Sequence, residues 1–155
     1  MTDRWTPATE TLLHYAARAD HIARTIRPAL AAGKWVISDR YADSTLAYQG
    51  YGHGVAKAFI QDLCRHVAGQ TWPDLTVIMD IAAEEGLRRA LARKGAETRY
   101  EQMDLAFHQR LRAGFQEIAK LEPRRCAVVD AGADIATVQA AIQQVVRERL
   151  GVNAP

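Results

Sequence analysis

Apolar residues recur at three- and four-residue steps through the first thirty residues, which is the spacing of one face of an α-helix. Thr6 and Pro7 are typical of a helix start, as N-cap and first helical residue. Pro28 is expected to kink or divide this helix, and Gly33 is suited to end it. The expected buried face consists of Leu12, Ala16, Ala19, Ala23, Ile26 and Leu30. A polar stripe lies about 200° round the helix, where solvent exposure is usual: His14, Arg18, His21 and Thr25.

Three short apolar runs are typical of parallel strands. Residues 35–37 (WVI) form the first, and residues 74–81 (DLTVIMDI) the clearest, apolar almost throughout and expected to be buried on both faces. Residues 126–130 (CAVVD) form the third. Helices are predicted over residues 55–68, 84–94, 103–121 and 134–150. Their expected buried residues are Phe59, Ile60, Leu63 and Val67 in the first, and Phe107, Leu111, Phe115 and Ile118 in the third.

This alternation of helices and strands predicts an α/β fold, with three layers in which helices cover both faces of a parallel sheet. The length of 155 residues is that of one ordinary domain. Three strands are few for such a sheet.

Composition excludes several classes of function. The formal net charge of +2 is too small to predict binding of nucleic acid or of a membrane surface. No apolar run reaches the roughly 20 residues of a membrane span, and the start is unlike a signal peptide. Cys64 and Cys126 have no zinc-ligand spacing, so two free thiols in a reducing cytoplasm are expected.

The first predicted strand ends at Ser38-Asp39-Arg40-Tyr41, where an acidic and a basic residue are adjacent. Ligands of open α/β sheets bind outside the carboxyl ends of strands, so this pair is a candidate binding site. The alternative is a solvated ion pair in a surface turn. A guanidinium suits phosphate because it is always charged and binds its oxygens bidentately.

The sequence DRY, followed by Ser44-Thr45 and by AYQG at residues 47–50, resembles the signature of the thymidylate kinase (dTMP kinase) family. PALAAGKWVISDRY upstream, PDLT at residues 73–76 and VDA at residues 129–131 extend the resemblance over nearly the whole chain. The family implies the P-loop NTPase, nucleoside monophosphate kinase type of fold. It also implies the reaction ATP + dTMP → ADP + dTDP, by in-line transfer with Mg²⁺ arriving on ATP.

The resemblance implies an acceptor site made by residues on either side of the DRY sequence. Asp39 would lie near Mg²⁺ and the phosphates, and Arg40 would hold the phosphate of dTMP. Arg18 matches the arginine that reaches the thymine edge, while His14 stands where the family has a phenylalanine that stacks on the base. Contacts to base and sugar would come from Thr45, Tyr48 and Gln49.

A basic cluster at residues 88–100 resembles the arginine-bearing lid of bacterial members, although a solvated helix end is the alternative. Its members are Arg88, Arg89, Arg93, Lys94 and Arg99. Lid arginines stabilise charge on the transferring phosphoryl group, and Arg93 is the first choice for this role, Arg89 the second. Asp130 and Ala131 resemble the family's adenine-side loop, which contacts the base mainly through backbone.

The phosphate-binding sequence GxxxxGK[ST] does not occur in the 155 residues. Gly33-Lys34 is followed by tryptophan, and the glycines at 50, 52 and 54 do not match GxGxxG and are expected to make a loop flexible. The chain is therefore expected to be an N-terminally incomplete, single thymidylate kinase-like domain with impaired transfer. A non-catalytic nucleotide-binding remnant and a kinase for another nucleoside monophosphate are the alternatives. A homodimer is expected by analogy with the family.

Overall fold

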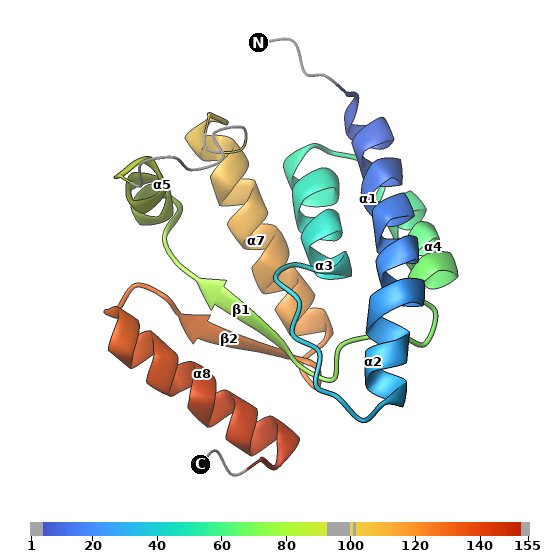
Figure 1. Cartoon of the computed structure of the whole chain (residues 1–155). Coiled ribbons are helices and arrows are strands. Elements are labelled where there is room, and N and C mark those ends of the chain that lie inside the picture. Colours follow the sequence, from blue (N-terminus) through green and yellow to red (C-terminus); the bar gives the residue numbers. More distant parts are fainter. Residues whose placement is uncertain (1–4, 93–99, 101, 153–155) are drawn as a thin grey trace. The chain divides into compact units, whose positions relative to one another are not determined.

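The computed structural model describes residues 5–92, 100 and 102–152. The chain divides into two compact units, Met1–Trp72 and Pro73–Pro155, which are described separately. The first unit is helical, and the second combines helices with a small sheet (Figure 1). Within the described residues, no helix is both long and apolar enough to cross a membrane.

The first unit begins with helix α1, Pro7–His21, which continues into a π-helical segment η1, Ile22–Ile26, and helix α2, Arg27–Ala31. The predicted start is confirmed, because the Thr6 hydroxyl accepts a hydrogen bond from the Thr9 amide at 3.2 Å. Pro28 has no N–H to donate to the carbonyl four residues earlier, and its ring crowds that carbonyl. The wider π turn directly before it accommodates both effects, so the predicted division occurs as a change of helix type.

Of the predicted buried face of the first helix, Ile26 is buried as expected, and the other five positions are exposed. Thr11, Tyr15, Ile22 and Ile26 are buried, whereas Leu12 and Leu30 are about half exposed. The inward face carries polar groups that have partners, as where the Thr11 hydroxyl donates to the Pro7 carbonyl at 2.8 Å. Hydrophobic spacing therefore predicted the burial of Ile26 and missed that of Thr11, Tyr15 and Ile22.

The segment after DRY is helical, not a flexible loop. Helix α3, Ala42–Thr45, leads into a second π-helical segment η2, Leu46–Gly52, and helix α4 follows over Lys57–Ala68. Gly50 lets η2 approach α4, since a Cβ there would lie 3.3 Å from side-chain carbons of Ile60 and Leu46. Gly54, with φ +76°, does serve a turn. The core of the unit is formed by Tyr15, Ile22, Ile26, Ala42, Ile60, Cys64 and Ala68.

Residues 35–37 do not form the predicted strand. The segment is irregular, with Trp35 64% and Ile37 95% exposed. A strand exists only where a neighbour pairs with its backbone, and the sheet of the described residues consists of β1 and β2. A β-branched pair is therefore insufficient to specify a strand here.

In the second unit, strands β1, Thr76–Asp80, and β2, Cys126–Asp130, pair in parallel with Asp80 opposite Asp130. The helices of this unit are α5, Ala83–Ala92, α7, Leu105–Leu121, and α8, Ile135–Leu150. Helix α7 packs against both strands and α8 against β2 (Figure 1). Asp134 caps α8 as the sequence predicts, its carboxylate accepting from the Thr137 amide at 3.0 Å.

Burial in the helices follows the predictions more closely than burial in the sheet. Phe107, Leu111 and Ile118 of α7 are buried as expected, and Phe115 is half-buried. In α4, Ile60 is buried but Phe59 is exposed. Met79 of β1 is 55% exposed, so this strand is not buried on both faces. Cys64 and Cys126 are both buried, and neither forms a disulfide within the described residues.

Candidate functional site

Arg18 is the centre of a polar cluster in the first unit. Its Nη2 donates to the Tyr41 carbonyl and to the Thr45 hydroxyl, each at 3.0 Å. The guanidinium carbon lies 4.7 Å from the ring centre of Tyr15 and 5.3 Å from that of Tyr41, within cation–π range. The structure thus brings together two predicted site residues, Arg18 and Thr45.

One nitrogen of this guanidinium has an unused donor. Nη1 of Arg18 is buried and has no hydrogen-bond partner among the described residues. Burial lowers the pKa of Arg18 and raises those of Tyr15 and Tyr41. An arginine remains charged even so. A buried cation with an open donor is a feature that an acceptor-bearing ligand would satisfy.

Arg40 has the left-handed backbone conformation, with φ +67°. The Ser38 hydroxyl donates to the Arg40 carbonyl at 2.9 Å, and the Arg40 guanidinium lies 4.8 Å from the centre of the Tyr48 ring. Both Asp39 and Arg40 are exposed. For a non-glycine residue this conformation costs about 1–2 kcal/mol, and such strain concentrates at functional sites.

Gln49 and Glu10 form a buried pair that the sequence did not predict. The Gln49 amide donates to a Glu10 carboxylate oxygen at 3.2 Å, and the two residues are 1% and 5% exposed. The bond directs the NH₂ group of Gln49 toward α1. His14 also belongs to α1, one turn before Arg18 on the same face, and is exposed. A buried glutamate facing AYQG was not detectable from helical periodicity.

In the second unit, the carboxyl end of β1 is tied to α7 by an ion pair. Arg112 donates from Nε and Nη2 to the two carboxylate oxygens of Asp80, at 2.8 and 2.7 Å. These hydrogen bonds lower the pKa of Asp80, and Gln116 adds weaker bonds at 3.3 Å. The Ala131 amide donates to the Asp80 carbonyl at 2.8 Å, which holds the ends of the two strands together.

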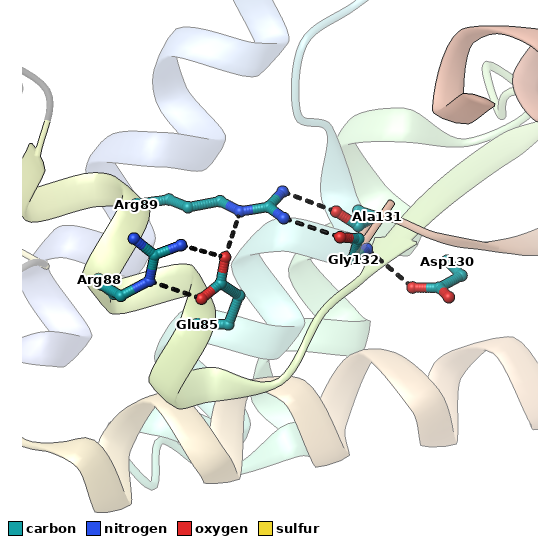
Figure 2. A network of polar contacts seen from close by, with 6 residues as sticks. All are labelled: Glu85, Arg88, Arg89, Asp130, Ala131 and Gly132. Carbon is teal, nitrogen blue, oxygen red and sulfur yellow. Dashed lines mark hydrogen bonds and ion pairs between the residues drawn. The ribbon is translucent and has the colours of Figure 1, made fainter. Parts of the chain in front are cut away.

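Two predicted lid residues, Arg88 and Arg89, lie beside this edge on α5 (Figure 2). Both donate to the Glu85 carboxylate, and these bonds lower the pKa of Glu85 to about 2. Arg89 also donates to the carbonyls of Ala131 and Gly132, at 2.9 and 2.8 Å. The other predicted lid residues, Arg93, Lys94 and Arg99, lie outside the described residues.

Comparisons with known proteins match this chain over most of its length. A family model described as "Thymidylate kinase" matches residues 2–142. The thymidylate kinase of Caulobacter vibrioides is 57% identical over 97% of the chain, and that of Jannaschia sp. 49% identical over 96%. The chain spans 72% and 71% of the lengths of these two relatives, and 65% of that of a Cereibacter sphaeroides relative. A crystal structure of thymidylate kinase from Ehrlichia chaffeensis matches 94% of this chain and 67% of that one, with a TM-score of 0.75 and 33% identity.

The parallel strands and the structural likeness define a P-loop NTPase-like α/β protein. Among proteins of this class, the chain belongs to the thymidylate kinase family, which is a family of phosphotransferases. The resemblance given by DRY and AYQG is thereby confirmed at the level of the family.

Proposed function

We propose that this protein takes part in ATP-dependent phosphorylation of dTMP to dTDP. The observation that carries the proposal is Arg18, a buried guanidinium held by Tyr41 and Thr45 with its Nη1 donor left open. A thymine carbonyl is an acceptor of suitable chemistry for this donor. Because an unpaired buried donor costs about 1–3 kcal/mol, satisfying it adds to the affinity for the base.

The remaining acceptor contacts follow from the neighbouring side chains. Arg40, exposed and held over the Tyr48 ring, binds the phosphate of dTMP. Thr45 and Gln49 contribute hydroxyl and amide groups to base and sugar. His14 stacks on the base from α1 in place of the family's phenylalanine.

ATP is the proposed phosphoryl donor, with Mg²⁺ bound to its phosphates. No group of three or more potential metal-ligating side chains occurs among the described residues. Mg²⁺ is commonly held by one or two carboxylates together with substrate phosphates, and Asp39 is the candidate carboxylate. The ion would neutralise charge on the phosphates, while Arg93 from the proposed lid would stabilise charge on the transferring group.

Residues 1–155 contain no GxxxxGK[ST] sequence, and this observation favours a second function for the chain by itself, binding of dTMP without transfer. Both functions require the same acceptor site. They differ in whether dTDP forms when ATP and Mg²⁺ are added to the 155-residue chain, for which we expect no turnover.

The first test is calorimetric titration of the full chain with dTMP. Arg18→Ala removes the buried cation and should weaken binding at least tenfold, since truncating a buried charged partner costs about 2–5 kcal/mol. His21→Ala, at an exposed position of the same helix, is the control and should bind as the parent does. Unchanged affinity in Arg18→Ala, or a parent chain that prefers another monophosphate, would refute the dTMP site.

We also propose that the protein forms a homodimer through the exposed apolar stripe of α1. Leu12, Ala16 and Ala19 share this stripe and are exposed, although their spacing is that of a buried face. A second copy of the chain would cover them.

A further inference from the structure

The tyrosine of the DRY sequence is held within the first unit at its backbone, its ring and its hydroxyl. The Tyr41 carbonyl accepts from Arg18 Nη2 at 3.0 Å and from the Ser44 amide at 3.2 Å, which uses both of its lone pairs. The centre of the Tyr41 ring lies 5.3 Å from the guanidinium carbon of Arg18. The Tyr41 hydroxyl donates to the Thr71 carbonyl at 2.8 Å. One side chain therefore joins Arg18 to a distant segment of the same unit.

Thr71, the acceptor for this hydroxyl, is itself fixed by two helices. Its amide donates to the carbonyl of Ala68, the last residue of α4, at 2.8 Å. Its hydroxyl accepts from Nε of Arg27, the first residue of α2, at 3.0 Å. The far end of the Tyr41 ring is thus tied to a backbone position that is already held in place.

Tyr15 provides a comparison within the same cluster, because its ring also lies beside Arg18. The centre of that ring is 4.7 Å from the guanidinium carbon, and the residue is 2% exposed. The Tyr15 hydroxyl is buried and has no hydrogen-bond partner in the part of the chain that the structure describes. Both tyrosines contact the cation through their rings, and the bonded hydroxyl distinguishes Tyr41.

We propose that Tyr41 is a positioning residue whose hydroxyl bond to Thr71 holds the Arg18 guanidinium in its binding orientation. The inference rests on the proposed function, and it adds a residue that acts on the ligand only through Arg18. The donors of a guanidinium form a rigid planar fork, so holding Nη2 against the Tyr41 carbonyl also fixes the direction of the open Nη1.

Fixing this direction before the ligand arrives should strengthen binding. A preorganised donor requires less ordering when a ligand acceptor approaches it. Tyr41→Phe keeps the aromatic ring and its cation–π contact and removes only the hydroxyl bond. Tyr41→Ala removes the ring as well. The two variants therefore should have graded effects, the larger in Tyr41→Ala.

Nitrogen-15 NMR of the arginine side chains tests the positioning step on the full chain without ligand. The Arg18 Nε–Hε signal, assigned by its loss in Arg18→Ala, reports rotation of the guanidinium about the Nε–Cζ bond. We expect this rotation to be about threefold faster in Tyr41→Phe, the equivalent of one modest hydrogen bond, and faster still in Tyr41→Ala. Tyr15→Phe should stay within twofold of the parent, because it removes a hydroxyl without a partner. Parent-like rotation in Tyr41→Phe, or equal acceleration in Tyr15→Phe, would overturn the proposal.

A double-mutant cycle tests whether Tyr41 acts on the ligand through Arg18, with calorimetric titration of dTMP as the measurement. Tyr41→Phe should weaken binding about threefold when Arg18 is present and cause no further loss in the Arg18→Ala background. Equal losses in the two backgrounds would overturn the proposal, because Tyr41 would then act independently of Arg18. A parent chain that binds no dTMP would refute the proposed function and leave the NMR result to decide the role of Tyr41.

Discussion

At the scale of single residues, Arg40 joins backbone strain to a candidate phosphate contact. Its φ of +67° is a conformation that glycine adopts without penalty, yet the chain has arginine there. The guanidinium lies against Tyr48 and the carbonyl is held by Ser38, so the surroundings fix the conformation. The sequence DRY predicted a binding residue at this position, and nothing in its pattern predicted the strain.

We expect Arg40→Gly to be more stable than Arg40→Ala. Alanine retains a backbone cost of about 1–2 kcal/mol that glycine avoids, and the greater unfolded-state entropy of glycine offsets about 0.5–1 kcal/mol of that gain. Thermal melts of the two variants measure the difference, which should be a few °C. Both variants should lose affinity for dTMP equally, because both lack the guanidinium. A lower melting temperature for Arg40→Gly would show that the strain is negligible.

At the scale of elements, the sequence predicted most helices, the second and third strands and both cap residues, Thr6 and Asp134. These features depend on local chemistry, namely periodicity and hydrogen bonds within one turn. The strand at residues 35–37 and most of the inward face of the first helix were wrong because they depend on distant partners. Burial of Glu10 and Arg18 requires Gln49, Tyr41 and Thr45, which no local pattern encodes.

The Asp80–Arg112 pair joins β1 to α7, and we expect Asp80→Asn to lower the melting temperature by a few °C at pH 7. The folded pKa of Asp80 is lowered by Arg112, so its contribution to stability is present above the unfolded pKa of about 3.9. It is lost as pH falls through the folded pKa. Melts from pH 7 to pH 2 should therefore show parent and variant converging in acid.

Asp74→Asn is the matched control for this series, because Asp74 is exposed shortly before β1. It should melt close to the parent at every pH. A difference between parent and Asp80→Asn that persists unchanged at pH 2 would contradict the ion-pair explanation and point to packing instead.

At the scale of the whole molecule, the candidate residues are divided between the two units. The acceptor cluster around Arg18 lies in the first, and the Arg89 network with Asp130 lies in the second. The contacts of Arg18 and those of Arg89 therefore depend on different packed helices and strands. A substitution at Arg18 can be tested by dTMP binding without altering the hydrogen bonds of Arg89.

The last prediction concerns association of the whole chain. Burying the exposed stripe of α1 against a second copy would remove apolar surface from water, at about 25 cal/mol per Å². Sedimentation should then give twice the chain mass of 17.2 kDa. Ala16→Glu places a charge on the stripe and should shift the protein to monomer. Ala17→Glu, also exposed and about 100° round the helix, is the control and should leave the dimer intact. A monomeric parent, or equal effects of the two substitutions, would refute this interface.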